Sequence, residues 1–401
     1  MLRERLGRYP VERYPVQHAT TQFHLGSALL HAGETGSALQ ALSAAQQVFS
    51  TCGMPLEQAK ATMMVGVALR GAGRNGEAAA AFRAASASLA ELEAPSEQAA
   101  ASYNLGLVLR DTGDTAGSRA AWSCAHELFL SAGHPAQAAA AARDHGGSLL
   151  SDGDATAALP LLELAAALSE RAGDDAGTAA AANALGLAHL AVGDTPAAVG
   201  VLRRALEFVP RTVRPDDHAM VKANLALALE QDRQAARARL AAVQVLGVPE
   251  APLPVRTQAR EVLHRLGGPA DADLLSVLDE EDPQAWPGVL REELGRAAAG
   301  NLTERDALLR SLFDGLLARP GRAYDLAEAL LQIVLELPPR SYATTVEAVV
   351  AATAGRPEQD AERLRAVVSS ALARFAIPQW QRLSASLNAA ATASGQPAQW
   401  R

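Results

Sequence analysis

The first residues whose type and spacing could support chemistry are three histidines near the N-terminus, His18, His24 and His31. His24 and His31 are seven positions apart, so they lie on one face of a helix. A zinc site needs three or four ligands that converge, held in place by further hydrogen bonds. No cysteine or carboxylate is in phase with these histidines, so we expect no metal there.

Motifs for catalysis or cofactor binding are missing from the sequence. It contains no glycine-rich phosphate loop ending in Lys-Ser/Thr, no His-Glu-x-x-His and no Gly-x-Ser-x-Gly. Cys52 and Cys124 are far apart and neither has a metal-type neighbour, which favours free thiols in a reducing cytoplasm. We therefore expect no cofactor, no metal and no catalysis, with an enzyme site in residues 283–401 as a weaker alternative.

The elements that position these side chains follow from a period of 40 residues. One column of the repeat contains Gly26, Gly66, Gly106, Gly146, Gly186 and Ala226. Seven residues later stand Gly33, Gly73, Gly113, Gly153 and Gly193. Sixteen residues after the first column stand Leu42, Phe82, Trp122, Leu162, Leu202 and, in the sixth unit, Ala242. A period kept over six units predicts tandem structural repeats.

Each column has a physical explanation in a pair of helices. Apolar residues spaced by three, four and seven mark one buried face of a helix. The first glycine lets two helix axes approach closely, and the second ends the first helix in a left-handed conformation that glycine adopts cheaply. In the run Gly193-Asp194-Thr195-Pro196 we expect Thr195 to cap the second helix and Pro196 to begin it.

The repeating pattern resembles the tetratricopeptide repeat (TPR) family, with a 40-residue instead of a 34-residue unit. The resemblance is clearest in the run Tyr103-Asn104-Leu105-Gly106-Leu107-Val108-Leu109-Arg110-Asp111-Thr112-Gly113-Asp114. The resemblance covers roughly residues 17–247. It implies an all-α fold, a right-handed α-solenoid of antiparallel helix pairs in which each pair packs only on its neighbours. The first helices would line a concave groove that binds peptides or proteins.

The resemblance also implies which side chains face that groove. Amides there can bond to a peptide backbone and arginines can bind carboxylates, although an ordinary solvated surface is the alternative. The family's clamp for a C-terminal carboxylate is not expected, because Phe23 and Ser27 stand where it needs lysine and asparagine. The candidate peptide-binding or partner-binding residues are Phe23, His24, Lys60, Met64, Arg70, Tyr103, Asn104, Arg110, Arg143, Asp144, Asn183 and Asn224.

The fourth repeat departs most from the pattern. It reads Arg143-Asp144-His145-Gly146-Gly147, and His145 occupies a column that holds leucine or valine in the other repeats. His189, in the fifth repeat, also replaces a leucine. Departures from a local pattern often mark functional positions. The alternative is a pair of buried imidazoles that neighbouring groups satisfy.

The remaining chain predicts further helices. We divide the sequence into a lead-in at 1–16, six repeats at 17–250, a degenerate repeat or bend at 251–282 and a C-terminal helical region at 283–401. The last region is either a continuation of the solenoid by degenerate repeats or a small separate bundle. Its expected helices are 284–299, 302–318, 322–336, 341–354, 358–375 and 378–394.

Composition narrows the functional classes. The net charge of −8 argues against nucleic-acid binding, and the absence of a long apolar run argues against a membrane span. All basic residues except Lys60 and Lys222 are arginine, which is typical of a GC-rich genome, as in many bacteria. We predict a cytoplasmic, non-catalytic scaffold that binds a protein or peptide partner, with homo-oligomerisation left open. The alternative is a regulator that responds to a small ligand or peptide and has no DNA-binding domain of its own.

Overall fold

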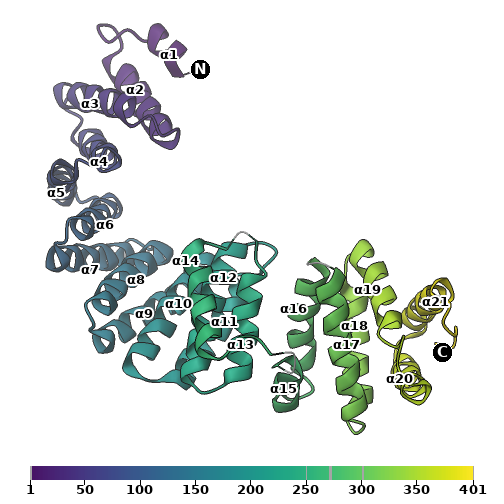
Figure 1. Cartoon of the computed structure of the whole chain (residues 1–401). Helices are drawn as coiled ribbons and strands as arrows, with labels where there is room; N and C mark the ends of the chain where they lie inside the picture. Colours follow the sequence, from purple (N-terminus) through teal and green to yellow (C-terminus); the bar gives the residue numbers. More distant parts are fainter. Residues whose placement is uncertain (1, 250, 271–272, 300–301, 401) are drawn as a thin grey trace. The chain divides into compact units, whose positions relative to one another are not determined.

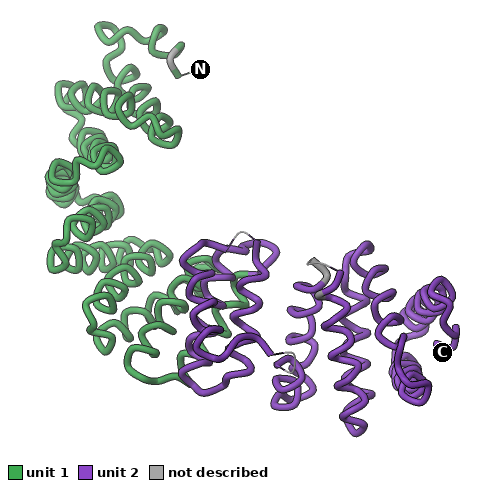
Figure 2. Tube along the Cα trace, viewed as in Figure 1, with its two compact units in different colours: residues 1–209 green, residues 210–401 purple. Residues whose placement is uncertain are grey.

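The computed structural model describes residues 2–249, 251–270, 273–299 and 302–400, and every regular element in them is a helix (Figure 1). The chain forms two compact units, unit 1 (Met1–Val209) and unit 2 (Pro210–Arg401) (Figure 2). The predicted all-α fold of consecutive helix pairs is confirmed. Unit 1 contains α1 (Leu2–Arg8), α2 (Pro15–His31), α3 (Thr35–Thr51), α4 (Pro55–Gly71), α5 (Asn75–Glu91), α6 (Pro95–Asp111), α7 (Thr115–Ser131), α8 (Pro135–Ser151), α9 (Ala155–Arg171), α10 (Asp175–Val192) and α11 (Thr195–Phe208).

Five helix pairs follow one another in unit 1. We call α2, α4, α6, α8 and α10 the first helices, and α3, α5, α7, α9 and α11 the second helices. Each helix packs mainly on the helices directly before and after it in the chain. The first helices also contact one another from pair to pair, because α4 touches α2 and α6, and α8 touches α10. Groups on successive first helices are therefore close enough to interact.

The two helices of each pair pack closely at the glycine column. A Cβ built on Gly186 would lie 2.6 Å from Cγ of Leu202, and one on Gly66 would lie 2.9 Å from Cε1 of Phe82. The bulky column thus packs directly onto the bare glycine backbone of the partner helix. In the sixth repeat Ala226 and Ala242 are both alanine, so the added methyl group is compensated by a smaller neighbour.

The turns inside the pairs use the second glycine. Gly33, Gly73, Gly113, Gly153 and Gly193 all have φ between +73° and +85°, as the sequence predicts. Arg233 takes this place in the sixth repeat with φ of +60°. The prediction that Thr195 caps α11 is wrong by one residue. Asp194 is the cap, because its carboxylate reaches the backbone N–H of Ala197, and Thr195 is already helical.

Unit 2 begins with the sixth pair and continues into the C-terminal helices. In the C-terminal part, α18 packs mainly on α16 and α20, and α19 on α17 and α21, so alternate helices are neighbours. The six predicted C-terminal helices are all present. The helices of unit 2 are α12 (Pro215–Gln231), α13 (Ala235–Leu246), α14 (Leu253–Arg265), α15 (Asp273–Glu280), α16 (Trp286–Ala299), α17 (Leu302–Ala318), α18 (Ala323–Glu336), α19 (Pro339–Ala351), α20 (Glu358–Leu372) and α21 (Ile377–Ala393).

The apolar cores of the units differ in composition. Unit 1 buries many alanines, with Phe82 and Trp122 among its few large side chains. The C-terminal part of unit 2 has one continuous cluster of large residues, from Leu274 to Trp400. Trp400 is 1% exposed, and Asn388 holds its backbone through two hydrogen bonds.

Candidate functional site

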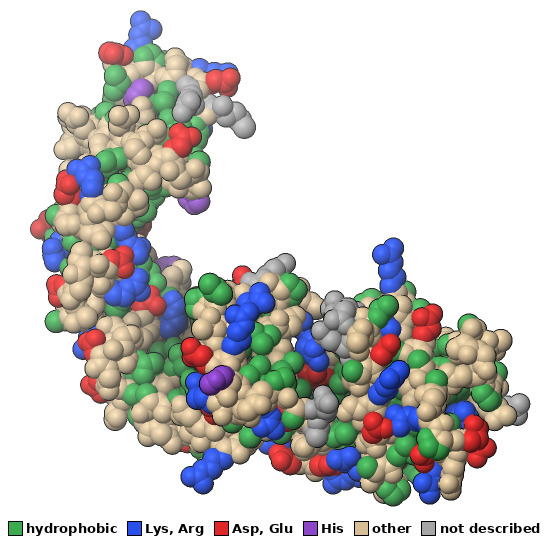
Figure 3. All heavy atoms as spheres, in the orientation of Figure 1, with side chains coloured by type: hydrophobic (Ala, Val, Ile, Leu, Met, Phe, Trp, Pro, Cys, Tyr) green, Lys and Arg blue, Asp and Glu red, His purple; other side chains and the backbone are tan. Residues whose placement is uncertain are grey.

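The candidate site is the solvent-exposed side of the first helices α4, α6 and α8 in unit 1. Most of the predicted residues on these helices are half-buried, with their stems packed and their polar groups at the surface. The region between α5 and α8 has basic and acidic side chains beside one another (Figure 3). We call this surface the polar face.

Arg70 on α4 reaches across to the next first helix. Its Nε and Nη2 donate to Oδ2 of Asp111 at 3.1 and 3.0 Å. Arg110 donates to the other oxygen of the same carboxylate, and its guanidinium lies 5.9 Å from the ring centre of Trp122. Burial opposes the charged form of Asp111, but the hydrogen bonds from the two arginines outweigh burial and lower the pKa of this carboxyl. Asp111 is therefore a fixed anion between two guanidinium groups.

A second contact of the same kind joins α6 to α8. The hydroxyl of Tyr103 donates to Oδ2 of Asp144 at 2.7 Å, and Arg143 donates to Oδ1 of Asp144. Burial, together with the nearby Asp144 carboxylate, raises the pKa of Tyr103 to about 12. The phenol therefore stays protonated and keeps donating at neutral pH.

Lys60 forms the third contact between successive first helices. Its ammonium lies 3.0 Å from the carboxylate of Glu97 on α6, and this hydrogen bond lowers the pKa of Glu97. Arg70 and Asp111, like Tyr103 and Asp144, are separated by 41 residues, one repeat plus one position. The spacing brings two predicted residues, Tyr103 and Asp144, together, and it brings Arg70 to Asp111, which was not among the predicted residues.

The other predicted residues have different surroundings. Asn104 donates to the backbone carbonyl of Ala100 one turn earlier, and Met64 and Asn183 are half-buried. Phe23 and His24 on α2 make an edge contact with ring centres 5.8 Å apart. Asn224 belongs to unit 2, is 7% exposed, and accepts a hydrogen bond from Gln258.

Two hollows open on the polar face. The first, of about 470 Å³, lies between α4 and α6 beside Arg70, Asn75, Asn104 and Asp111. The second, of about 370 Å³, is lined by residues of α6, α7, α8 and α10: Arg110, Thr115, Arg143, Asp144, Gly147, Ser148, Ser151, Asp152 and Ala184. We call the second one the Gly147 hollow.

Several residues of this face lie outside the predicted set. Asp111 binds Arg70 and Arg110, and Glu97 binds Lys60. Arg119 binds Ser148 and Asp152, two further residues of this face. One signal was available in the sequence, because opposite charges 41 residues apart fit the repeat register. Gly147 was a second signal, since Leu107 and Leu187 occupy the same column.

Unit 2 contains a separate cluster of buried charges. Lys222 on α12 forms an ion pair with Glu292 on α16, and His218 lies 3.5 Å from the same carboxylate. Burial alone would raise the pKa of Glu292, but His218 and Lys222 lower it to about 2. Next to it, Glu293 accepts from Gln244 and Arg296. This cluster ties the sixth repeat to the C-terminal helices.

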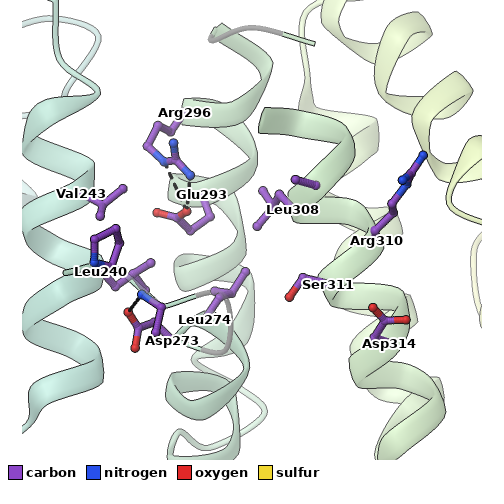
Figure 4. A pocket seen from close by; sticks show the side chains of 13 residues that line it. Leu240, Val243, Asp273, Leu274, Glu293, Arg296, Leu308, Arg310, Ser311 and Asp314 are labelled. Atoms are coloured by element: carbon purple, nitrogen blue, oxygen red, sulfur yellow. Dashed lines mark hydrogen bonds and ion pairs between the residues drawn. The ribbon is translucent and has the colours of Figure 1, made fainter. Parts of the chain in front are cut away.

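A cavity of about 530 Å³ lies beside this cluster in unit 2 (Figure 4). Leu240, Leu274 and Leu308 supply apolar walls, and Ser311 and Asp314 of α17 stand opposite Glu293 and Arg296. Its carboxylates are bound by arginines: Asp273 by Arg239, Glu293 by Arg296 and Asp314 by Arg356. The first and third of these pairs join different segments of the chain, and the second lies within α16.

The described residues contain no group of three or more His, Cys, Asp or Glu side chains arranged to bind a metal ion. None of their helices has the length and apolar character needed to cross a bilayer.

Fold and surface together define a helical-repeat protein of the solenoid class. Residues 137–211 match the family described as tetratricopeptide repeat, so the resemblance seen in the sequence is confirmed. No match was found among curated proteins.

Several solved structures are similar to the chain. BtubC (BKLC) from P. vanneervenii has a TM-score of 0.44 at 13% identity, covering 63% of this chain and 93% of that one. The apo form of RapI has a TM-score of 0.49 at 13% identity, covering 83% and 85%. The TPR2AB domain of yeast Sti1, in a complex with pHSP90, has a TM-score of 0.26 at 15% identity, covering 62% and 96%.

Proposed function

We propose that this protein is a non-catalytic scaffold that binds an extended segment of a protein partner on the polar face of unit 1. A solenoid of TPR-like repeats is in general a platform for protein interaction. The observation that carries the proposal is the row of half-exposed polar groups that contacts between α4, α6 and α8 hold in fixed positions.

Fixed side chains reduce the entropic cost of binding. A free arginine loses rotamer freedom when it binds a partner, whereas Arg70 and Arg110 are already held by Asp111. Arginine has five N–H donors, so a guanidinium that uses two of them for Asp111 can still donate to a peptide. Half-buried Met64 and Tyr103 add apolar contact area between the polar groups.

We also propose the reducing cytoplasm as the site of action. Cys52 and Cys124 are both exposed free thiols, the form that persists in a reducing compartment.

The test is a triple variant in which Asn104, Arg110 and Arg143 become alanine. We expect the affinity for a peptide selected from a 12-residue display library to fall at least about tenfold, because three direct contacts are removed. The melting temperature should stay within about 4 °C, because exposed ion pairs contribute little to stability. Binding is measured by fluorescence anisotropy and folding by circular dichroism.

A matched control changes two exposed residues of the second helices, Gln47 and Arg83, to alanine. This variant should bind as the native chain does. The assignment of the polar face is wrong if the triple variant binds normally, or if the control loses binding to the same extent.

A further inference from the structure

The Gly147 hollow exists because one side chain is missing from a regular column. The position directly after the first glycine holds Ser27, Val67, Leu107, Gly147 and Leu187 in the five repeats of unit 1, so only the fourth repeat has no side chain there. A Cβ built on Gly147 would meet nothing within 4 Å, so the space is open and packing does not require a glycine. Nor does the backbone, because Gly147 lies inside α8 with an ordinary helical φ.

The surroundings of the hollow are polar and ordered. Ser148 stands in a column that otherwise holds alanine or valine, and Arg119 donates to its hydroxyl and its carbonyl. Arg119 also binds Asp152 on the rim. On the opposite side Arg143 and Asp144 form their ion pair, with Tyr103 as the second donor to Asp144.

The hydrogen-bonding groups are unequally used. Both oxygens of Asp144 accept hydrogen bonds, from Tyr103 and from Arg143. Arg110 and Arg143 each use Nε and Nη2, and among the described residues neither donates from Nη1. The hollow and its immediate partners thus offer unused donors, while the deeper carboxylate is saturated.

The ion pairs around the hollow also favour a negatively charged ligand. Arg70, Arg110, Arg119 and Arg143 are paired along this run with only Asp111, Asp144 and Asp152. Arg70 and Arg110 share the carboxylate of Asp111, so Arg110, which lines the hollow, has no carboxylate of its own among these pairs. A group with negative charge and several acceptors fits this arginine best.

We propose that the Gly147 hollow receives the carboxylate side chain of an aspartate or glutamate within the bound peptide segment. The carboxylate accepts hydrogen bonds from the unused N–H groups of Arg110 and Arg143. This inference rests on the proposed function and assigns the fourth repeat as the place where an acidic residue of the partner is recognised. It involves an internal side chain, so a free C-terminus is not required.

The test fills the hollow with the residue that the neighbouring repeats carry. Gly147→Leu introduces the side chain of Leu107 and Leu187, and leucine favours helix more than glycine does, so the fold should be kept. The matched control is Gly200→Leu on α11, where a Cβ likewise meets nothing within 4 Å. The probes are peptides selected by the native chain from a 12-residue display library, each paired with a version carrying Gln for Glu and Asn for Asp.

We expect the native chain to prefer the acidic peptides over their amide versions at least tenfold. Gly147→Leu should remove that preference, and Gly200→Leu should keep it. The hollow assignment is overturned if Gly147→Leu binds the acidic peptides as the native chain does while the Asn104, Arg110 and Arg143 variant loses them; the proposed function then still stands. If the library yields no peptide for the native chain, both proposals fail.

Discussion

The two units place their charged side chains in opposite ways. The buried polar side chains of unit 1 are serines and threonines, such as Ser118 and Thr178. Unit 2 instead buries charged groups, with Lys222 6%, Glu293 1% and Arg305 7% exposed. A small hydroxyl group can form a hydrogen bond to the backbone of its own helix, whereas a buried charge needs a partner from another helix.

The difference suits the two units to different roles, with surface charges available for binding in unit 1 and buried charges joining helices in unit 2. Unit 1 is held by alanine and glycine packing, so its charged side chains remain at the surface of the first helices, which is where we propose that a partner binds. Unit 2 uses charges to join α12, which follows the 40-residue register, to α16, which does not. The predictions below test whether the contrast is as sharp as the structure indicates.

The largest effect is expected at the buried ion pair of unit 2. Lys222→Met removes the ammonium next to Glu292 and leaves a largely buried carboxylate with His218 as its remaining partner. Breaking a buried pair from one side should lower the free energy of unfolding by about 3 kcal/mol. Urea unfolding in a Trp122→Phe background measures this, because the remaining tryptophans, Trp286, Trp380 and Trp400, all belong to unit 2.

The control for this prediction removes both charges. Lys222→Met combined with Glu292→Leu should recover most of the lost stability, since neither charge is then left alone. If the single variant costs less than about 1 kcal/mol, the pair behaves as a surface pair, and the contrast between the units is weaker than proposed.

An intermediate effect is expected from the glycine packing of unit 1. Gly186→Ala places a methyl group 2.6 Å from Cγ of Leu202, so the two helices must separate or the leucine must move. Overpacking of this kind should cost about 1–3 kcal/mol, although alanine favours helix more than glycine does. Hydrogen exchange of the α10 and α11 amides, followed by mass spectrometry, reports the loss locally.

The sixth repeat suggests the compensating change. There Ala226 faces Ala242, so Gly186→Ala with Leu202→Ala copies a combination that the chain already uses. The double variant should be at least about 1 kcal/mol more stable than the sum of the two single effects predicts. Strict additivity would mean that the glycine column and the bulky column are not packed on each other.

Much of the fold was predictable because it follows from local rules repeated many times. The positive φ of Gly113 and the helix ends around Gly153 follow from one residue and its neighbours. The cap of α11 was misassigned by one position because Asp194 and Thr195 are both good capping residues. Only the geometry shows which side chain reaches the free N–H.

The site was predictable only in part, because its residues interact between repeats. The register identified Arg70 and Asp144 as surface groups, but not the carboxylate or phenol that each one contacts on another helix. The pair of Lys222 and Glu292 joins the sixth repeat to a helix outside the register, so the repeat spacing does not predict it. The signal for the Gly147 hollow is the absence of a side chain from a column, whereas the other signals are residues that are present.

The smallest effect concerns pH and His145, a histidine of unit 1 that interrupts an apolar column. Burial, followed by the positive charges of Arg119 and His126, lowers the pKa of His145 in the folded protein. Between this lowered pKa and the unfolded value near 6.5 the unfolded chain binds more protons, so stability falls as the pH is lowered through this range. His145→Leu restores the residue type of the column and should reduce the drop in melting temperature between pH 7.5 and pH 5.5.

The reverse exchange in another repeat sharpens this test. Leu105 occupies the same column as His145 one repeat earlier, and Leu105→His places a new imidazole in a comparable half-buried position. This variant should enlarge the drop in melting temperature at pH 5.5, because protonation again opposes burial. A His145→Leu protein that keeps the full drop would show that the acid sensitivity of unit 1 lies in other groups.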